Sequence, residues 1–290
     1  MKKLLILSGK GGTGKTTLAG AFIRLSSTRR YADCDVDAPN LHLVLSKDME
    51  PLIQDFYGLD KAWIDPDRCT NCGLCREHCR FDAIHPDPTH RVDPYGCEGC
   101  AVCQLVCPAA AITMQPAAAG VLMRYENHHI FSTARLNMGS GNSGKLVTEV
   151  KKQLGNDLDD TDLAIIDGSP GIGCPVIASI SGVDLVLVVA EPTVSGISDM
   201  ERILETAKIF RIPTAVCVNK YDVNQANTEK IEGHCRSRQI PYLGRIPYDP
   251  KAVMAANQGK TIVDLPCSSG QEAERIFYKL LKLIFQGKAG

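Results

Sequence analysis

Residues 9–17 read Gly-Lys-Gly-Gly-Thr-Gly-Lys-Thr-Thr, and this stretch decides the fold. An apolar run at residues 4–7 precedes it, and apolar residues at helical spacing follow it. It therefore joins a buried strand to a helix, and in that context it matches the pattern G-x-x-x-x-G-K-[ST] completely. We interpret it as a loop that binds phosphate.

Each residue type in this loop has a chemical role. The glycines permit positive φ and a close approach, so that backbone N–H groups can point at phosphate oxygens beside a helix N-terminus. Lys15 is expected to reach the terminal phosphates, and the Thr16 hydroxyl is expected to bind Mg²⁺. The predicted nucleotide-binding residues of the loop are Gly9, Lys10, Gly11, Gly12, Thr13, Gly14, Lys15, Thr16 and Thr17.

Lys10, directly after the first glycine, goes beyond the plain motif. The KGGTGKTT spelling resembles the deviant phosphate loop of the MinD/ParA family of ATPases, which includes the nitrogenase iron protein. In that family the extra lysine crosses a face-to-face dimer and contacts the nucleotide of the partner subunit. The resemblance implies an ATP-dependent homodimer with Lys10 and Lys15 as catalytic residues. A lysine that is merely solvated beside the phosphates is the alternative.

The composition is that of a globular chain with an unusual number of cysteines. The 290 residues are 44% hydrophobic and 22% charged, and the formal net charge of -1 gives no reason to expect nucleic-acid binding. No signal peptide or apolar run of membrane-spanning length is visible, so a cytoplasmic location is expected. In that compartment, 13 cysteines more often bind metal than form disulfides.

Acidic residues gather after the first predicted helix, at Asp33, Asp35 and Asp37. In the MinD/ParA family a D-x-D segment ends the second strand, and its second Asp helps to position the attacking water and the Mg²⁺ shell. By that resemblance Asp35 is the catalytic candidate. Asp37 stays open because no clearly apolar strand fixes the register, and a solvated acidic loop is the simplest alternative.

Eight cysteines fall in two runs between residues 69 and 107. Each run has the spacing C-x₂-C-x₂-C-x₃-C, which is typical of bacterial two-cluster ferredoxins. In that pattern three cysteines of each run hold one [4Fe-4S] cluster, and the fourth ligates the other cluster. The first cluster is then assigned Cys69, Cys72, Cys75 and Cys107, and the second cluster Cys97, Cys100, Cys103 and Cys79.

The spacing within each run also has a geometrical reason. Three thiolates two residues apart can wrap three corners of a cube, whereas zinc, the alternative, usually takes two separated C-x₂-C pairs. We predict an inserted α+β ferredoxin domain at residues 61–116. Residues 63–65 and 111–114 are expected to form its outer strands, and Ile84 and Val92 its inner hairpin. With clusters bound, this acidic lobe suits a basic redox partner.

After an expected exit linker at residues 116–120, the ATPase pattern resumes. Residues 137–145 form a polar glycine-rich loop with no clear strand before it, interpreted as a segment that moves with the nucleotide state or as a second anion site. Asp167 ends an apolar run and is predicted to hold Mg²⁺ through water, with residues 168–173 as a switch loop. Cys174 is expected to be a small buried residue, and a cluster ligand between two subunits is the alternative.

Two further strand ends are predicted to bind the base. Residues 219–222 read N-K-x-D, which resembles the base-reading loop of this class of enzymes. Asn219 is therefore expected to contact the base, while Asp222 keeps GTP open as the alternative to ATP. Pro247 lies in a segment that resembles the adenine-side loop of the family. The repeated apolar strands predict an α/β fold with a mainly parallel sheet and helices on both faces.

The two resemblances together cover nearly the whole chain. Residues 1–60 and 120–290 are predicted to form a P-loop ATPase domain, interrupted by the ferredoxin insert. The two resemblances imply a protein that binds ATP, Mg²⁺ and two [4Fe-4S] clusters. In such a protein, nucleotide-driven dimer switching is coupled to electron transfer toward an unidentified redox partner. An iron-sulfur cluster carrier or scaffold ATPase is one alternative. A redox-sensing positioning module is another, supported only by an amphipathic helix at residues 272–285, which could bind membranes but which packing on the sheet explains equally well.

Overall fold

The computed structural model describes residues 1–45, 50–155 and 162–286. Its centre is a nine-stranded sheet with the order β13-β12-β11-β1-β10-β2-β9-β8-β3. The strands from β13 to β9 in that order are parallel, and β8 and β3 add an antiparallel edge. The predicted α/β class with a mainly parallel sheet is confirmed.

β1 lies between β10 and β11, so its carboxyl end opens where the strand order changes direction. That position is where open α/β sheets bind ligands. The strands of the large sheet are β1 Lys2–Leu7, β2 Arg30–Asp33, β3 Leu52–Tyr57, β8 Ala118–Glu126, β9 Ile130–Leu136, β10 Leu163–Asp167, β11 Leu185–Ala190, β12 Thr214–Asn219 and β13 Tyr242–Ile246.

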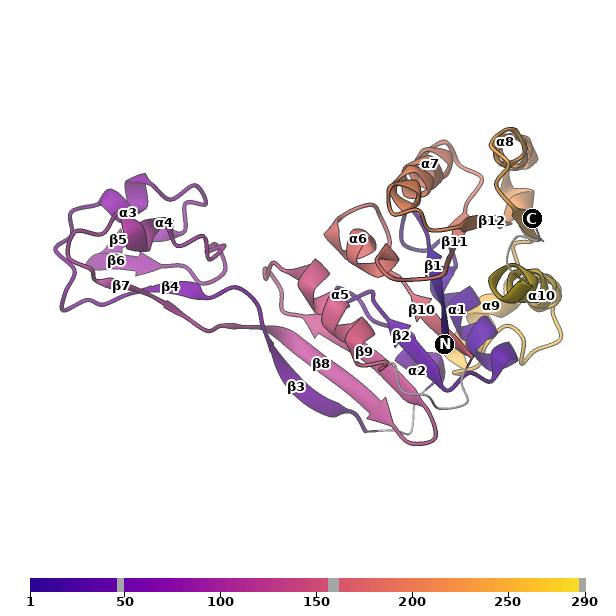
Figure 1. Cartoon of the computed structure of the whole chain (residues 1–290), viewed down its shortest axis with the longest axis horizontal. Helices are drawn as coiled ribbons and strands as arrows, with labels where there is room; N and C mark the ends of the chain where they lie inside the picture. The colour runs from indigo at the N-terminus through magenta and orange to yellow at the C-terminus, as the bar shows by residue number, and fades with distance from the viewer. Residues whose placement is uncertain (46–49, 156–161, 287–290) are drawn as a thin grey trace.

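Helices cover both faces of the sheet because the residues of β1 alternate between two cores. Leu5 and Leu7 belong to the core under α5, α6, α7 and α8, whereas Leu4 and Ile6 belong to the core under α1 and α10 (Figure 1). All four side chains are buried, as expected of a central parallel strand. The helices of this domain are α1 Lys15–Ser26, α2 His42–Leu45, α5 Ser143–Lys152, α6 Cys174–Ile180, α7 Val194–Ile209, η1 Tyr221–Val223, α8 Gln225–Ser237, α9 Lys251–Asn257 and α10 Ser268–Gln286.

The terminal helix α10 packs on the sheet. Ile276, Phe277 and Leu280 are buried, and the ring centroids of Phe277 and Phe22 of α1 lie 5.2 Å apart. Most of the apolar face of α10 is therefore packed in the core. This amphipathic helix was the only sequence feature in favour of a positioning module, and its packing explains the apolar pattern without a membrane. Within the described part of the chain, no helix is both long enough and apolar enough to span a bilayer.

The segment between β3 and β8 forms a separate lobe, called here the cysteine lobe (residues 61–115), at the end of the arm that β3 and β8 make (Figure 1). Ile64 of β4 pairs with Ile112 of β7, and Ile84 of β5 pairs with Val92 of β6. These are the outer and inner pairings that the sequence predicts. The elements of the lobe are β4 Lys61–Ile64, α3 Leu74–Glu77, β5 Ile84–Asp87, β6 Thr89–Val92, α4 Val102–Leu105 and β7 Ile112–Gln115.

Two details differ from the sequence prediction. β8 begins at Ala118, so most of the predicted exit linker belongs to the large sheet. A strand, β9, also precedes the glycine-rich loop. We attribute the failure to predict β9 to its buried Ser132 and Thr133, which interrupt the apolar pattern expected of an interior strand. Ser132 satisfies its buried hydroxyl by donating to Oε1 of Gln153 at 2.7 Å.

Candidate functional site

The phosphate loop connects β1 to α1 and needs its glycines for two different reasons. Gly12 and Gly14 have φ angles of 78° and 95°, in the left-handed region that side chains disfavour. A Cβ on Gly14 would also lie 2.2 Å from Nδ2 of Asn219, so this position has no room for a side chain. The loop thus depends on glycine for both conformation and close packing.

Hydrogen bonds from the end of β12 hold the loop in place. Asn219 donates from Nδ2 to the carbonyl oxygen of Thr13 at 2.7 Å, and Lys220 donates from Nζ to that of Gly12 at 2.9 Å. Inside the loop, the hydroxyl of Thr13 donates to the carbonyl oxygen of Lys10 at 2.9 Å. These bonds use the loop carbonyls and fix its shape, and the positive end of α1 lies directly behind it, which fits an anionic phosphate.

Asp167 joins the two phosphate-side residues of the loop. Its Oδ1 accepts from Lys15 Nζ at 2.6 Å, and its Oδ2 accepts from the Thr16 hydroxyl at 2.6 Å. Burial lowers the pKa of Lys15, but the charge of Asp167 and its hydrogen bond outweigh that effect and raise it. Because both Thr16 and Asp167 offer oxygen atoms at one point, they form the donor set that a hard cation such as Mg²⁺ takes.

The acidic cluster divides into one structural and one site-facing residue. The fully buried carboxylate of Asp33 accepts from the backbone N–H groups of Asp35, Asn40 and Leu41 at 2.9–3.0 Å, so it closes the turn after β2. Asp35 is half-buried; burial raises its pKa, while the nearby Lys15 ammonium lowers it. Asp37 is exposed. Asp35 accepts a hydrogen bond from the backbone N–H of Ala38, and of the three it is the half-buried carboxylate that interacts with Lys15 of the phosphate loop.

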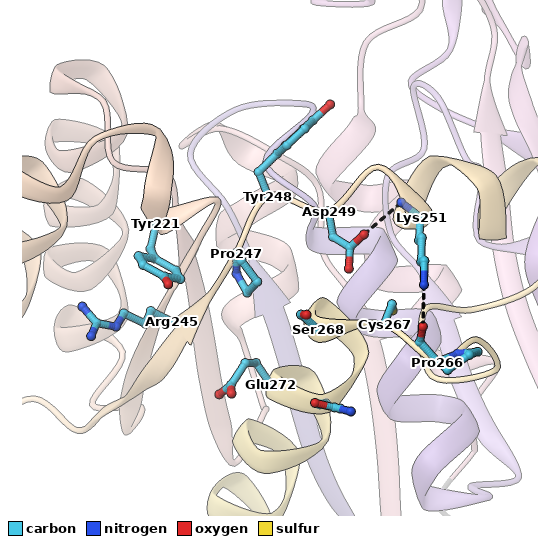
Figure 2. Close-up of a pocket in the computed structure, with 11 residues that line it drawn as sticks. Tyr221, Arg245, Pro247, Tyr248, Asp249, Lys251, Pro266, Cys267, Ser268 and Glu272 are labelled. Atoms are coloured by element: carbon cyan, nitrogen blue, oxygen red, sulfur yellow. Dashed lines mark hydrogen bonds between the residues drawn. The ribbon is translucent and has the colours of Figure 1, made fainter.

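Of the predicted base-binding residues, Pro247 lines a pocket of about 750 Å³, whereas Asn219 is not part of its lining and instead holds the phosphate loop. Pro247 and Tyr248 line it, and the guanidinium carbon of Arg245 lies 4.9 Å from the ring centroid of Tyr221 at its side (Figure 2). Asp222 accepts a hydrogen bond from the backbone N–H of Tyr248 at 2.8 Å. Its carboxylate therefore fixes the loop after β13, a role that the sequence did not indicate.

Lys10 is held within its own chain. Its Nζ lies 3.0 Å from Oε2 of Glu191 and 3.4 Å from the hydroxyl of Thr193. The other oxygen of Glu191 accepts from Lys220 at 2.9 Å. The sequence did not identify Glu191 as a site residue. The sequence feature that could have identified it is an acidic residue directly after an apolar strand. Only the fold shows that this strand, β11, lies beside β1.

The eight cysteines of the cysteine lobe surround two cavities. Each cavity takes three thiols from one run and one thiol from the other run. The first is lined by Cys69, Cys72, Cys75 and Cys107, and the second by Cys79, Cys97, Cys100 and Cys103. The crossed sets are those that the ferredoxin pattern implies.

The residues that line these cavities fit the predicted cluster ligands. Across the described residues, no three His, Cys, Asp or Glu side chains converge closely enough to bind one metal ion. Four cysteines line each of the two hollows. Apolar residues line both hollows, including Ile64 and Ile112 in the first and Ile84 in the second. The donor set of four thiols is the one that [4Fe-4S] clusters take.

The glycine-rich loop lies against the cysteine lobe at the second cavity. A Cβ on Gly141 would lie 3.1 Å from Oε2 of Glu98, and a Cβ on Gly139 would lie 3.7 Å from the ring of Tyr95. Both lobe residues lie within four positions of Cys97 or Cys100 in the sequence. The contact therefore joins the ATPase domain to the chain that surrounds this cavity.

The helix that follows this loop, α5, is tied to both ends of α6. At the start of α6, a Cβ on Gly144 would lie 3.2 Å from the carbonyl oxygen of Cys174. At its end, Lys151 donates to the carbonyl oxygens of Ala178, Ser179 and Ser181 at 2.5–2.9 Å. α6 follows the loop after Asp167, so these contacts connect that loop with α5. The Cys174 side chain is exposed, so the prediction that it is buried was wrong.

Comparison with known proteins agrees with this geometry. The chain matches the profile described as the CobQ/CobB/MinD/ParA nucleotide binding domain over residues 4–262. The uncharacterized protein MJ0578 of Methanocaldococcus jannaschii is 35% identical over 78% of this chain and 80% of its own length. An iron-sulfur cluster carrier protein of Pyrococcus horikoshii is 24% identical over 97% of this chain and 87% of its own length.

A solved structure shows the same fold. The septum site-determining protein MinD from Pyrococcus horikoshii, complexed with Mg-ADP, matches with a TM-score of 0.58 and 18% identity, and the match covers 97% of this chain and 96% of that one. The predicted resemblance to the MinD/ParA ATPases is thereby confirmed. From its phosphate loop, its sheet order and this match over most of its length, the chain belongs to the CobQ/CobB/MinD/ParA family of nucleotide-binding domains.

Proposed function

We propose that this MinD/ParA-type ATPase couples nucleotide-driven dimer switching to electron transfer through two [4Fe-4S] clusters in its cysteine lobe. The observation that carries the proposal is the arrangement of eight cysteines in two crossed sets of four around two cavities. The same crossed arrangement of cysteines holds the two clusters of bacterial ferredoxins, which are electron-transfer proteins. The two sites share one chain, and the glycine-rich loop of the ATPase domain lies against the cysteine lobe.

The nucleotide chemistry follows from the residues around the phosphate loop. Lys15 neutralises charge on the terminal phosphates, while Thr16 and Asp167 hold Mg²⁺, which in turn stabilises charge that develops during phosphoryl transfer. Asp35, the half-buried carboxylate that interacts with Lys15, orients the attacking water. ATP is favoured over GTP because Asp222, which would have to bind guanine, already accepts a hydrogen bond from Tyr248. Pro247, which lines the pocket beside Tyr221, would contact the base, whereas Asn219 uses its amide to hold the phosphate loop.

The proposed switch is the change from a free subunit to an ATP-bound dimer. Lys10 lies at the start of the phosphate loop with a side chain that is 40% exposed, so it is able to reach outward. In the ATP-bound dimer Lys10 contacts the partner's nucleotide and stabilises charge in the transition state. A redox protein docks on the cysteine lobe, whose bound clusters add negative charge.

Coupling runs from the loop after Asp167 through α6 and α5 to the second cavity. Both ends of α6 are tied to α5, so the two helices move together. Shifting a two-state equilibrium from 1:99 to 99:1 needs about 5.5 kcal/mol. A change in one-electron potential of about 240 mV needs a similar free energy, at 59 mV per decade. One ATP per subunit covers either change.

Anaerobic purification with iron and sulfide analysis tests the cofactor part of this proposal. We expect about eight iron and eight sulfide per chain, from two clusters of four. The Cys103→Ser variant should lose the second cluster while the first remains. ATP hydrolysis should depend on Lys15 and increase in the presence of the redox partner. Iron-free protein from anaerobic cells, or zinc in its place, would contradict the proposal.

An iron-sulfur cluster carrier is the second candidate function. Relatives from three Pyrococcus species and from Methanocaldococcus jannaschii bear that name at 24–26% identity. Incubation of the loaded protein with an apo-ferredoxin acceptor separates the two functions. Transfer of iron to the acceptor supports a carrier, whereas retention of both clusters through several ATP turnovers supports electron transfer.

A further inference from the structure

We propose that Glu191 is an intramolecular restraint on Lys10, which holds this lysine in the free subunit and must release it before it can contact a partner's nucleotide. The inference rests on the proposed ATP-dependent dimer and adds a regulatory residue to it. Nothing in the phosphate-loop motif points to Glu191, which follows the last residue of β11, 181 positions after Lys10 in the sequence.

The fold places Glu191 beside the phosphate loop. β11 pairs with β1 in parallel register, with Leu7 opposite Val188, so the two strands end next to each other. The side chain of Glu191 is 16% exposed, and each carboxylate oxygen has one lysine partner: Oε2 lies 3.0 Å from Lys10 and Oε1 lies 2.9 Å from Lys220. The carboxylate thus bridges two cations.

The charge state of Glu191 suits this role. Burial opposes its ionisation, but the hydrogen bonds from Lys220 and Lys10 and the charges of both lysines outweigh burial and hold the pKa of Glu191 below its ordinary value. The residue is therefore a carboxylate at neutral pH, and it presents a full negative charge to Lys10.

Of the two lysines, Lys10 is the one that can leave. Lys220 also donates to the carbonyl oxygen of Gly12, so it is held at two points. The second contact of Lys10 is the Thr193 hydroxyl at 3.4 Å, and that hydroxyl already accepts from the N–H of Gly196 as the N-cap of α7. When Lys10 departs, Glu191 still has Lys220 as its partner.

Separating Lys10 from Glu191 therefore requires only a small free energy. No buried charge is left unpaired, so the large penalty of a broken buried ion pair does not arise. A partly exposed ion pair such as Lys10–Glu191 is worth up to about a five-fold change in an equilibrium constant. A symmetric dimer releases two such pairs, so the restraint lowers the dimerisation constant by up to about 25-fold.

The test compares the wild-type protein with Glu191→Gln, which keeps the shape but removes the charge. Glu205→Gln is the matched control, because it removes the same charge from an exposed ion pair with Arg238. In nucleotide-free protein, the rate of Lys10 acylation by acetic anhydride is measured by mass spectrometry. We expect a several-fold increase for Glu191→Gln and none for Glu205→Gln.

Sedimentation with ATP and Mg²⁺ then measures the dimer. Glu191→Gln should dimerise at a protein concentration up to about 25-fold lower than wild type. Unchanged acylation, or dimerisation that is equal to or weaker than wild type, would overturn the restraint. If the wild-type protein and Lys10→Ala both stay monomeric with ATP, the proposed dimer switch fails, while the acylation result still decides whether Glu191 holds Lys10.

Discussion

The nucleotide site and the cysteine lobe achieve order in different ways. The nucleotide site is complete without its ligand: Lys15 is paired with Asp167, and Asn219 and Lys220 fix the loop carbonyls. The cysteine lobe has only a small core of its own, in which Cys75, Cys97 and Cys103 are themselves buried members. The large sheet supports the first site, whereas the order of the lobe is proposed to depend on bound clusters.

Removal of iron is expected to have the largest effect, because it should change the folded state of the cysteine lobe but not that of the large sheet. Without clusters, the thiols that line the two cavities lose their shared partners, and the cysteine lobe should unfold while the large sheet stays intact. Hydrogen exchange followed by mass spectrometry measures this directly. Amides of β4 to β7 should lose protection after anaerobic chelation, whereas those of β10 and β11 should keep it. A lobe that stays protected without iron would remove the distinction between the two sites.

Asp167→Asn should produce the next largest effect, a loss of stability of the ATPase domain at the nucleotide site. Lys15 is 5% exposed, and the substitution leaves its charge without its main partner. Breaking a buried pair in this way costs about 3–5 kcal/mol. Denaturant unfolding of the ATPase domain measures this loss, and ATP hydrolysis should fall with it.

The control for this variant is Asp37→Asn, which removes an exposed carboxylate near the same loop and should change stability by less than about 0.5 kcal/mol. Equal stability of the two variants would show that the Lys15–Asp167 pair does not organise the nucleotide-free site.

Gly144→Val tests the link between the two regions. A Cβ at this position approaches the backbone of Cys174, so a larger side chain should separate α5 from the start of α6. We expect ATP binding to persist and the ATP-dependent change in cluster potential to fall by at least half. Gly233→Ala in α8 is the control, since open space surrounds that position. If Gly144→Val keeps the full change in potential, the path through α5 and α6 is wrong.

The smallest expected effect concerns pH. Burial and the neighbouring Asp167 raise the pKa of Asp33 above its unfolded value. Folded protein therefore binds more protons than unfolded protein in the mildly acidic range, and stability falls as pH rises through the folded pKa. Asp33→Asn should flatten this slope between about pH 4 and 7, since the folded pKa of Asp33 is about 7. The exposed Asp37→Asn should keep the wild-type slope, and identical slopes in all three proteins would contradict the assignment.

Local sequence patterns predicted the parts of each site that lie close together in the chain. The phosphate loop needs glycines and a lysine at fixed positions, and the cluster cavities need thiols at fixed spacing, so both are visible in short stretches. Asp167 could be found because an apolar strand ends in it. These features follow from the chemistry of the ligand, which constrains residue type and spacing.

Contacts between distant segments could not be predicted in this way. Glu191 meets Lys10 only because the sheet places β11 beside β1, and Gly141 meets Glu98 only because the β3–β8 arm positions the lobe. β9 escaped prediction because an interior strand of this sheet accommodates the polar Ser132 and Thr133. In each case tertiary packing, which leaves no local pattern, decides the outcome.

The central claim is that the nucleotide site and the clusters influence each other. An anaerobic redox titration followed by electron paramagnetic resonance, with and without ATP and Mg²⁺, tests it most directly. We expect ATP to shift the midpoint potential of the cluster assigned to Cys79, Cys97, Cys100 and Cys103, and we expect Lys15→Ala to abolish the shift. Identical potentials with and without ATP, in protein that binds both ATP and iron, would contradict it.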